Sequence, residues 1–167
     1  MPGVTISPFP LHLPDADATR ALGRALGAQL QPGLIVALLG ELGAGKTALA
    51  KAAIAQVASV DEDDVGSPTY VLAVEYTGRV DVLHLDAYRL GSAEALEDLD
   101  FQLASQVEFA ALVEWADRVE GALPEDRLTI ELEHTETGRD VTITANGPMS
   151  SAALAGLRAA WAAHEQA

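Results

Sequence analysis

Apolar residues near the start of the chain recur at intervals of three and four positions. This spacing places side chains on one face of a helix, and it is shared by Ala18, Leu22, Ala25, Leu26 and Leu30. Asp15 precedes the pattern and can cap the helix, while Pro32-Gly33 follows it and ends the helix. The pattern therefore predicts an early helix, which follows an extended segment containing Pro8, Pro10 and Pro14.

Two later stretches are apolar without any alternation of polar residues. Leu34–Leu39 and Ala110–Glu114 read as strands that are covered on both faces, as in a parallel sheet. A Gly-rich turn follows the first of them, and an Ala-rich segment at about Thr47–Ala58 predicts a helix after that turn. Parallel strands joined through helices are typical of an α/β fold in which helices cover both faces of the sheet.

Other segments indicate antiparallel pairs and surface elements. Tyr70–Tyr76 and Val80–Leu85 flank the turn Thr77-Gly78-Arg79, and they read as a hairpin. Alternating positions predict a second, half-exposed hairpin at the edge of the sheet, with strands Leu128–Leu132 and Val141–Thr144 around Thr137-Gly138-Arg139. The remaining expectations are a solvated acidic loop at Asp61–Asp64, a turn and acidic helix at Gly91–Phe101, and a final helix at about 150–164 that Ser150 or Ser151 caps.

Composition narrows the class of protein. The 167 residues include 10 basic and 25 acidic side chains, which gives a formal net charge of −15, and no cysteine. The absence of cysteine excludes disulfides, thiolate zinc sites and cysteine nucleophiles, and one domain over residues 1–167 is expected from the length. The negative charge disfavours autonomous binding of nucleic acid or of an anionic membrane.

No apolar run approaches the roughly 20 residues of a membrane span, and the first residues do not resemble a secretory signal, so we expect a cytoplasmic protein.

The segment Gly40–Thr47 fits the phosphate-loop pattern G-x-x-x-x-G-K-[ST] at every fixed position. Glycines allow backbone N–H groups to point into one concavity, the following helix adds its positive end, and a lysine reaches the outer phosphates. The expected nucleotide contacts are therefore Glu41, Leu42, Gly43, Ala44, Gly45, Lys46 and Thr47. Thr47 also offers a hydroxyl to Mg²⁺. Neither lysine of the chain lies in a guanine-reading Asn/Thr-Lys-x-Asp sequence, so ATP is the expected nucleotide.

Two acids stand at the ends of apolar strands, where phosphoryl-transfer sites hold the shell of the metal ion. Asp86 ends Val82–Asp86 and Glu114 ends Ala110–Glu114; each is a candidate for catalysis and for Mg²⁺, and the alternative for each is a simple cap. Thr69 lies before a strand, where a hydroxyl can sense the γ-phosphate, although an ordinary turn is a serious rival. His84 reads as a core histidine rather than a catalyst.

These motifs, in this order and spacing, resemble the bacterial TsaE (YjeE) family. The segments that carry the likeness are Gly40–Thr47, Ser67-Pro68-Thr69-Tyr70, His84–Leu90 and Val113-Glu114-Trp115. The resemblance implies a P-loop ATPase fold with a mostly parallel central sheet, and an ATPase required for threonylcarbamoylation of adenosine 37 in tRNAs that read codons beginning with A. It also implies that the ATP cycle keeps the complex of TsaD and TsaB turning over, so that tRNA is met only through this complex.

The same resemblance implies roles for individual residues. Lys46 and the loop amides hold phosphates, Thr47 and Glu114 belong to the Mg²⁺ site, and Asp86 lies near the metal or γ-phosphate. It further implies nucleotide contacts from the start of the first helix, near Asp17 to Thr19, and from the Gly138-Arg139 hairpin.

Two other functions fit part of the pattern. In a small-molecule P-loop kinase, Asp86 would be the base that accepts a proton from the substrate. Such an enzyme needs an arginine-rich lid, but Gly91–Phe101 contains no Arg or Lys. A nucleotide-responsive scaffold without meaningful turnover is the other alternative, and measurement of ADP release with and without partners separates it from an ATPase.

Overall fold

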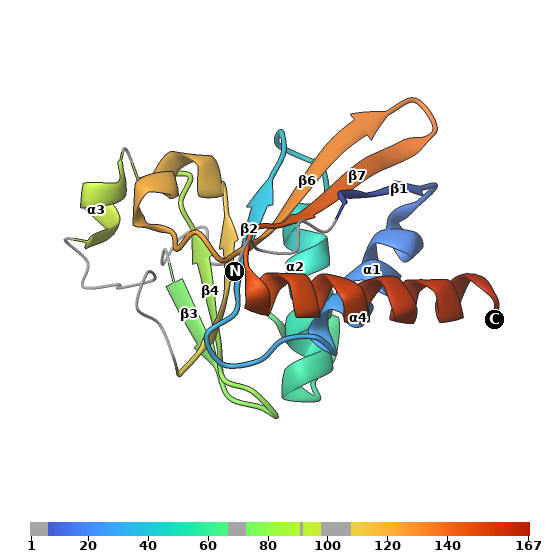
Figure 1. Ribbon diagram of the computed structural model, residues 1–167, viewed down its shortest axis with the longest axis horizontal. Helices are drawn as coiled ribbons and strands as arrows, with labels where there is room; N and C mark the ends of the chain where they lie inside the picture. Colours follow the sequence, from blue (N-terminus) through green and yellow to red (C-terminus); the bar gives the residue numbers. More distant parts are fainter. Residues whose placement is uncertain (1–6, 67–72, 91, 98–107) are drawn as a thin grey trace.

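A seven-stranded sheet organises the computed structural model, which describes residues 7–66, 73–90, 92–97 and 108–167 (Figure 1). The strand order is β1-β7-β6-β2-β5-β4-β3. The strands are β1 (Phe9–Leu13), β2 (Ile35–Leu39), β3 (Ala73–Tyr76), β4 (Val82–Asp86), β5 (Ala110–Glu114), β6 (Leu128–Thr135) and β7 (Gly138–Ala145). Neighbours in the centre, from β6 through β2 and β5 to β4, are parallel, and the outer pairs are antiparallel. The predicted α/β fold with a mostly parallel centre is confirmed.

The edge of the sheet beside the second hairpin differs from the prediction. The hairpin itself forms as expected from β6 and β7, but β7 also pairs with β1, which is therefore the outermost strand. Within β1, Pro10 lies opposite Thr142. A proline lacks the N–H that a central strand must donate, so an edge strand is where the sheet tolerates it.

Side-chain alternation divides the core into two layers. On one face, Val36 and Leu38 of β2 pack in the larger cluster with residues of α1 (Ala16–Gly27), α2 (Lys46–Ala58) and α4 (Pro148–Glu165). On the other face, Ile35 and Ala37 pack with residues of the short helix α3 (Ala93–Glu97) and the 3₁₀ segment η3 (Ala116–Ala122). This arrangement confirms the three-layer architecture. None of the described helices is both long and apolar enough to cross a membrane.

Helix α1 packs closely on α2, the helix that follows the Gly-rich turn. A Cβ atom at Gly23 would lie 2.5 Å from the Leu49 carbonyl oxygen, and one at Gly27 would lie 2.6 Å from that of Ala53. Distances this short exclude any side chain without a shift of the backbone, so both glycines allow the close contact. The packing fixes the start of α1 beside the Gly-rich turn.

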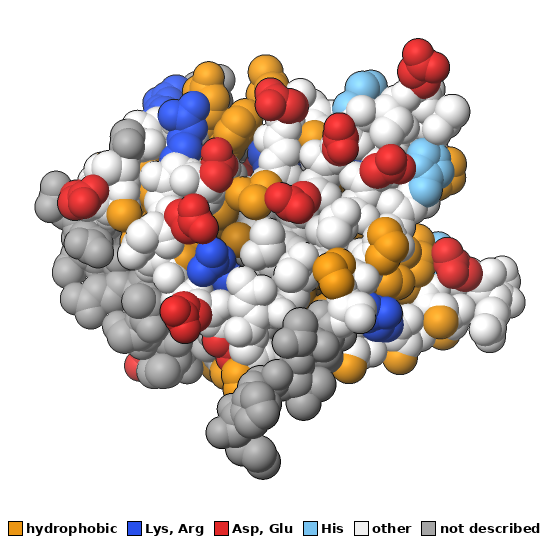
Figure 2. Space-filling model, turned by 45° about the horizontal axis from the view of Figure 1, so that its top comes forward, with side chains coloured by type: hydrophobic (Ala, Val, Ile, Leu, Met, Phe, Trp, Pro, Cys, Tyr) orange, Lys and Arg blue, Asp and Glu red, His pale blue; other side chains and the backbone are white. Residues whose placement is uncertain are grey.

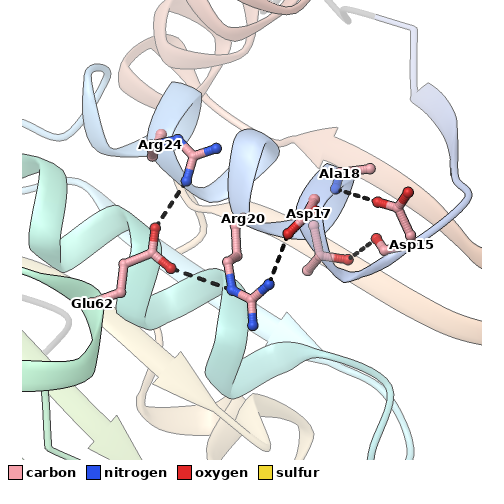
Figure 3. Close-up of polar contacts among 7 residues, drawn as sticks. Asp15, Asp17, Ala18, Arg20, Arg24 and Glu62 are labelled. Atoms are coloured by element: carbon pink, nitrogen blue, oxygen red, sulfur yellow. Dashed lines mark hydrogen bonds and ion pairs between the residues drawn. The ribbon is translucent and has the colours of Figure 1, made fainter.

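Charged side chains around α1 form the network shown in Figure 3. Asp15 caps α1 as predicted, because its carboxylate accepts a hydrogen bond from the Ala18 N–H at 2.8 Å. The acidic run was expected to be a solvated loop, but it forms a 3₁₀ turn at Glu62–Asp64. Glu62 contacts Arg24 at 2.9 Å and Arg20 at 3.5 Å, so part of this acidic run is bound to α1.

The final helix begins earlier than predicted. Gly147 is its N-cap, and Ser150 acts from inside the first turn, where its hydroxyl oxygen accepts from the N–H groups of Asn146 and Gly147. The carboxylate of Asp126 accepts from the N–H groups of Met149 and Ser150, both at 2.9 Å. Neither Ser150 nor Ser151 is therefore the N-cap, because Asp126, distant in sequence, satisfies the first turn.

Candidate functional site

The Gly-rich turn connects β2 to α2 and has the backbone shape that its glycines permit. Gly43 and Gly45 have φ angles of 81° and 111°, in the left-handed region that favours glycine. Gly45 is the N-cap of α2 and has no side chain that could accept from the first N–H groups of the helix. These N–H groups and the positive end of the helix dipole form a site suited to an anion.

Lys46 is buried at the base of this turn. Its Nζ donates to the carbonyl oxygens of Gly40 and Glu41, at 2.5 and 2.9 Å, and lies 4.0 Å from the centre of the Trp115 ring. Burial lowers the pKa of Lys46, while the negative charges of Glu114 and Asp86 oppose this shift. The lysine thus lies within its own loop, beside the place where a phosphate would be bound.

Asp86 and Glu114 lie side by side at the ends of β4 and β5. They are partners in the register of the parallel pair, and only 7% and 2% of their surfaces are exposed. The Thr47 hydroxyl donates to Glu114 Oε1 at 2.5 Å, and Asp86 Oδ1 accepts from the Tyr88 N–H at 2.9 Å. The structure therefore brings together Thr47, Asp86 and Glu114, and it also gives Asp86 the capping contact that was the alternative reading.

His84 was expected to be a core histidine, and it is completely buried. However, its Nε2 atom lies 2.6 Å from Glu114 Oε2, so the ring belongs to the same cluster. A signal for this position existed in the sequence. His84 lies two residues before Asp86 on one strand, and side chains two apart on a strand share a face.

Aromatic rings line one side of the same site. Trp115 follows Glu114 directly and has a φ angle of 57°, which is uncommon for a bulky residue. This left-handed turn of the backbone places the indole beside Lys46 and within 5.0 Å of the Tyr88 ring, centre to centre. Arg118 lies over both rings, at 4.8 Å from Tyr88 and 5.8 Å from Trp115. Trp115 thus forms part of the wall of the site as well as packing against its neighbours.

A cavity of about 340 Å³ joins these groups, and Leu42 and Tyr88 at its edge are 88% and 50% exposed. The residues that line it are Leu42, Gly43, Gly45, Lys46, Thr47, Ala48, Asp86, Tyr88, Glu114 and Trp115. An acidic groove of about 670 Å³ adjoins it, with Glu41, Asp117, Glu131, Glu133 and Asp140 among its lining residues. The predicted metal residues and most of the predicted phosphate contacts thus face one cavity, whereas Glu41 lines the adjoining groove and Ala44 is buried.

The predicted nucleotide contacts outside the Gly-rich turn differ in how close they lie to that turn. A Cβ atom at Gly45 would meet the Arg139 Nε at 3.0 Å and the Thr19 Cγ2 at 3.5 Å, so both side chains lie against the turn. Gly138 itself packs against the backbone of β1, where a Cβ atom would lie 2.1 Å from the Leu13 carbonyl oxygen. Of these two hairpin residues, Arg139 rather than Gly138 approaches the loop. Thr69 lies outside the described residues.

The described residues contain no group of three or more His, Asp or Glu side chains that could hold a metal ion by themselves. Mg²⁺ at a nucleotide site does not need such a group, since it keeps several waters and binds phosphates with one or two carboxylates. A hydroxyl and two carboxylates, from Thr47, Glu114 and Asp86, meet in one place. This set of oxygen atoms fits Mg²⁺ bound together with a nucleotide.

A strand, a glycine-rich loop and a helix, set in a mostly parallel sheet with acids at the ends of the next two strands, define a P-loop α/β protein. Comparison with known sequences gives the family within this class. The family model described as "Threonylcarbamoyl adenosine biosynthesis protein TsaE" matches residues 13–141, and the chain belongs to the TsaE family. Its family is involved in the biosynthesis of tRNA threonylcarbamoyladenosine, and the resemblance found in the sequence is confirmed.

Individual relatives support the same conclusion. The tRNA threonylcarbamoyladenosine biosynthesis protein TsaE of Treponema pallidum is 36% identical over 129 residues, which cover 77% of this chain and 94% of that protein. The protein of the same name from Bacillus subtilis is 34% identical over 133 residues, covering 78% and 82%. The crystal structure of Bacillus subtilis YdiB superposes with a TM-score of 0.73 at 28% identity, over 91% of this chain and 95% of that one.

Proposed function

We propose that this protein binds ATP with Mg²⁺, hydrolyses it, and thereby drives the cycle of the TsaD–TsaB complex in the modification of tRNA adenosine 37. The observation that carries the proposal is the contact between Thr47 and Glu114. It joins the start of α2 to the end of β5 at 2.5 Å, directly below the glycine-rich turn. A P-loop hydroxyl and a strand-end carboxylate in contact are the pair that such sites use around the metal ion.

The phosphates would bind in the turn. The N–H groups at the start of α2 supply donors, and Lys46 supplies the positive charge. Lys46 Nζ now contacts two carbonyl oxygens of its own loop. A phosphate oxygen carries more negative charge than a carbonyl oxygen, so it would draw the ammonium group toward the nucleotide.

Thr47, Glu114 and Asp86 would hold Mg²⁺ beside these phosphates. When bound, the ion would neutralise the negative charge that develops on the transferring phosphoryl group. Asp86 is buried beside Glu114, so an Asp86 oxygen that does not contact the ion can accept a hydrogen bond from the attacking water. Trp115 and Tyr88 shield one side of the cavity from solvent.

The charge of the chain suits a protein partner better than a bare RNA. The formal net charge is −15. Figure 2 shows acidic side chains spread over the displayed face, with Lys and Arg in small separate areas. A phosphate backbone needs clustered cations. We therefore propose that tRNA is reached only through the TsaD–TsaB complex and that the partner surface is locally basic.

The test measures ADP release by the purified full chain with Mg²⁺ and with EDTA, each alone and with TsaD and TsaB. We expect slow, Mg²⁺-dependent release by the protein alone and faster release with both partners. Calorimetry with ATP and with GTP runs in parallel, and ATP should bind more tightly. ATP binding without any hydrolysis, with or without partners, would favour the nucleotide-responsive scaffold and overturn the proposed hydrolase.

A further inference from the structure

His84 lies on β4 between an apolar part of the sheet and the acidic strand ends. Val82, two residues earlier on the same face, is completely buried, and so is Leu112, the partner of His84 on β5. His84 is also 0% exposed. A buried polar ring costs free energy unless its nitrogens are hydrogen-bonded, so a histidine at this position calls for a specific reason.

Only one of its ring nitrogens has a hydrogen-bond partner among the described residues. Nε2 lies 2.6 Å from Glu114 Oε2, whereas Nδ1 is buried with no partner in that part of the structure. A carboxylate without its proton only accepts hydrogen bonds, so this contact assigns the donor role to Nε2 of His84 and the acceptor role to Glu114. The ring thus makes its one strong polar contact to the strand-end carboxylate.

Glu114 is held from two sides as a result. Thr47 donates to Oε1 at 2.5 Å, and His84 donates to Oε2 at 2.6 Å. These two donors come from different elements, α2 and β4, and they fix the rotation of the carboxylate as well as its position. Partners of this kind orient a metal ligand, and their loss typically lowers metal affinity or activity by about 10- to 100-fold.

We propose that His84 is a positioning residue, which holds Oε2 of Glu114 so that Oε1 stays directed to Thr47 and the metal side of the cavity. This inference rests on the proposed function. His84 touches neither nucleotide nor metal in this role; it acts through Glu114. Its loss should therefore weaken the response to Mg²⁺ and lower kcat, while metal-free nucleotide binding, which depends on the loop, should change little.

Two amide substitutions separate positioning from packing. The side-chain nitrogen of glutamine can take the place of Nε2, whereas that of the shorter asparagine corresponds to Nδ1 and falls short of Glu114. We expect His84→Gln to stay within about threefold of the native protein, and His84→Asn and His84→Leu to lose about 10- to 100-fold in kcat at saturating nucleotide. Val82→Ala is the matched control, because it opens a cavity on the same face without touching Glu114.

A double substitution tests whether His84 acts through Glu114. In a Glu114→Gln background, His84→Leu should have little further effect on Mg²⁺ dependence, because the carboxylate that His84 orients is gone. Additive losses in the double variant would contradict the inference and indicate an independent role.

Two readouts do not depend on turnover. In the nucleotide-free native protein, nitrogen–proton correlation spectra of the imidazoles should show His84 with its proton on Nε2, and Glu114→Gln should shift this signal. Calorimetry should show that Mg²⁺ tightens ATP binding in the native protein and in His84→Gln, and tightens it less in His84→Asn and His84→Leu. A proton on Nδ1 would overturn the inference even if no variant folds.

The remaining outcomes are equally distinct. If all three His84 variants match the native response to Mg²⁺, or if His84→Leu only lowers the melting temperature as Val82→Ala does, His84 is a packing residue and the inference fails. If the native protein binds ATP without any effect of Mg²⁺, the proposed function fails and the inference falls with it. In that case the Nε2 signal still reports the contact itself.

Discussion

Two glutamates in this protein are each held between two donors, in opposite surroundings. Glu114 is 2% exposed and lies between the Thr47 hydroxyl and the His84 ring. Glu62 has a side chain that is 26% exposed and, as Figure 3 shows, lies between Arg20 and Arg24, whose side chains are 43% and 49% exposed. The surface network has more formal charge, yet water and salt screen it. The buried network has less charge, but removal of the His84 ring would leave a buried carboxylate oxygen without its hydrogen-bond donor.

The comparison separates what the two networks do. Exposed ion pairs typically contribute about 0–1 kcal/mol. The Glu62 network therefore ties the 3₁₀ turn at Glu62–Asp64 to α1 with little effect on the stability of the fold. The Glu114 network lies beside the glycine-rich turn, where small displacements matter for chemistry. Substitutions in the two regions should therefore have different effects. Changes to the Glu114 network should lower the rate of hydrolysis, and changes to the Glu62 network should slightly lower the stability of the fold.

The largest effect is expected from Lys46→Ala at the buried site. The substitution removes a charge-assisted contact to the outer phosphates, which should cost roughly 2–4 kcal/mol in the transition state. Hydrolysis should fall about 30- to 1000-fold, measured as ADP release with Mg²⁺ and partners. Lys51→Ala removes the only other lysine, on the same helix, and should leave the rate near its native value. Equal rates for native protein and Lys46→Ala would contradict the P-loop mechanism.

Glu114→Gln should have the next largest effect. The amide keeps the size and hydrogen-bonding reach of the side chain but loses the charge that Mg²⁺ or water requires. We expect hydrolysis to fall by about 10- to 100-fold while ATP still binds, as measured by ADP release and calorimetry on the same preparation. Normal hydrolysis by this variant with partners present would show that Glu114 serves only as a structural cap.

A smaller effect is expected from salt. If the acidic surface steers the encounter with a basic partner, assembly with TsaD and TsaB should weaken between about 50 and 300 mM salt, where the Debye length falls from roughly 14 to 6 Å. The isolated protein should not bind tRNA at physiological salt. Titrations with labelled tRNA and with the TsaD–TsaB complex measure the two parts separately. Tight binding of naked tRNA, or assembly indifferent to salt, would contradict the respective part.

Glu62→Gln should have the smallest effect. It removes the charge between Arg20 and Arg24 and should lower the free energy of unfolding by about 0.2–1 kcal/mol, while hydrolysis stays unchanged. The loss should shrink in high salt, which denaturant titrations at two salt concentrations can measure. A loss well above this range, or one that salt does not reduce, would contradict the view that this network acts as an exposed ion pair.

Much of the fold followed from local sequence signals. The apolar runs at β2 and β5, the cap at Asp15 and the glycine-rich turn each have a pattern that can be read within a few residues. Strand β1 could not be found in this way. Prolines at positions 8 and 10 argue against a strand locally, and the partner that makes one, β7, is about 130 residues away. Likewise, the cap that Asp126 provides for α4 depends on a contact across the fold.

The candidate site shows the same limit. Asp86 and Glu114 could be predicted as neighbours, because both end strands at one edge of a parallel sheet. His84 could be placed on their face by alternation, but its hydrogen bond to Glu114 depends on the relative placement of β4 and β5. The short distance from Arg139 to Gly45 depends in turn on where the hairpin lies over the loop.

The pairing of β1 with β7 has a consequence for how the chain reaches this structure. Phe9–Leu13 is made before its partners, residues 139–143, which lie about 130 positions later in the chain. Strand β1 must therefore wait for β7 before it can join the sheet. Contacts between such distant segments slow folding, because a long loop must close before they form. During refolding, amide protection in β1 should therefore appear together with that of β7, after the central strands β2 and β5.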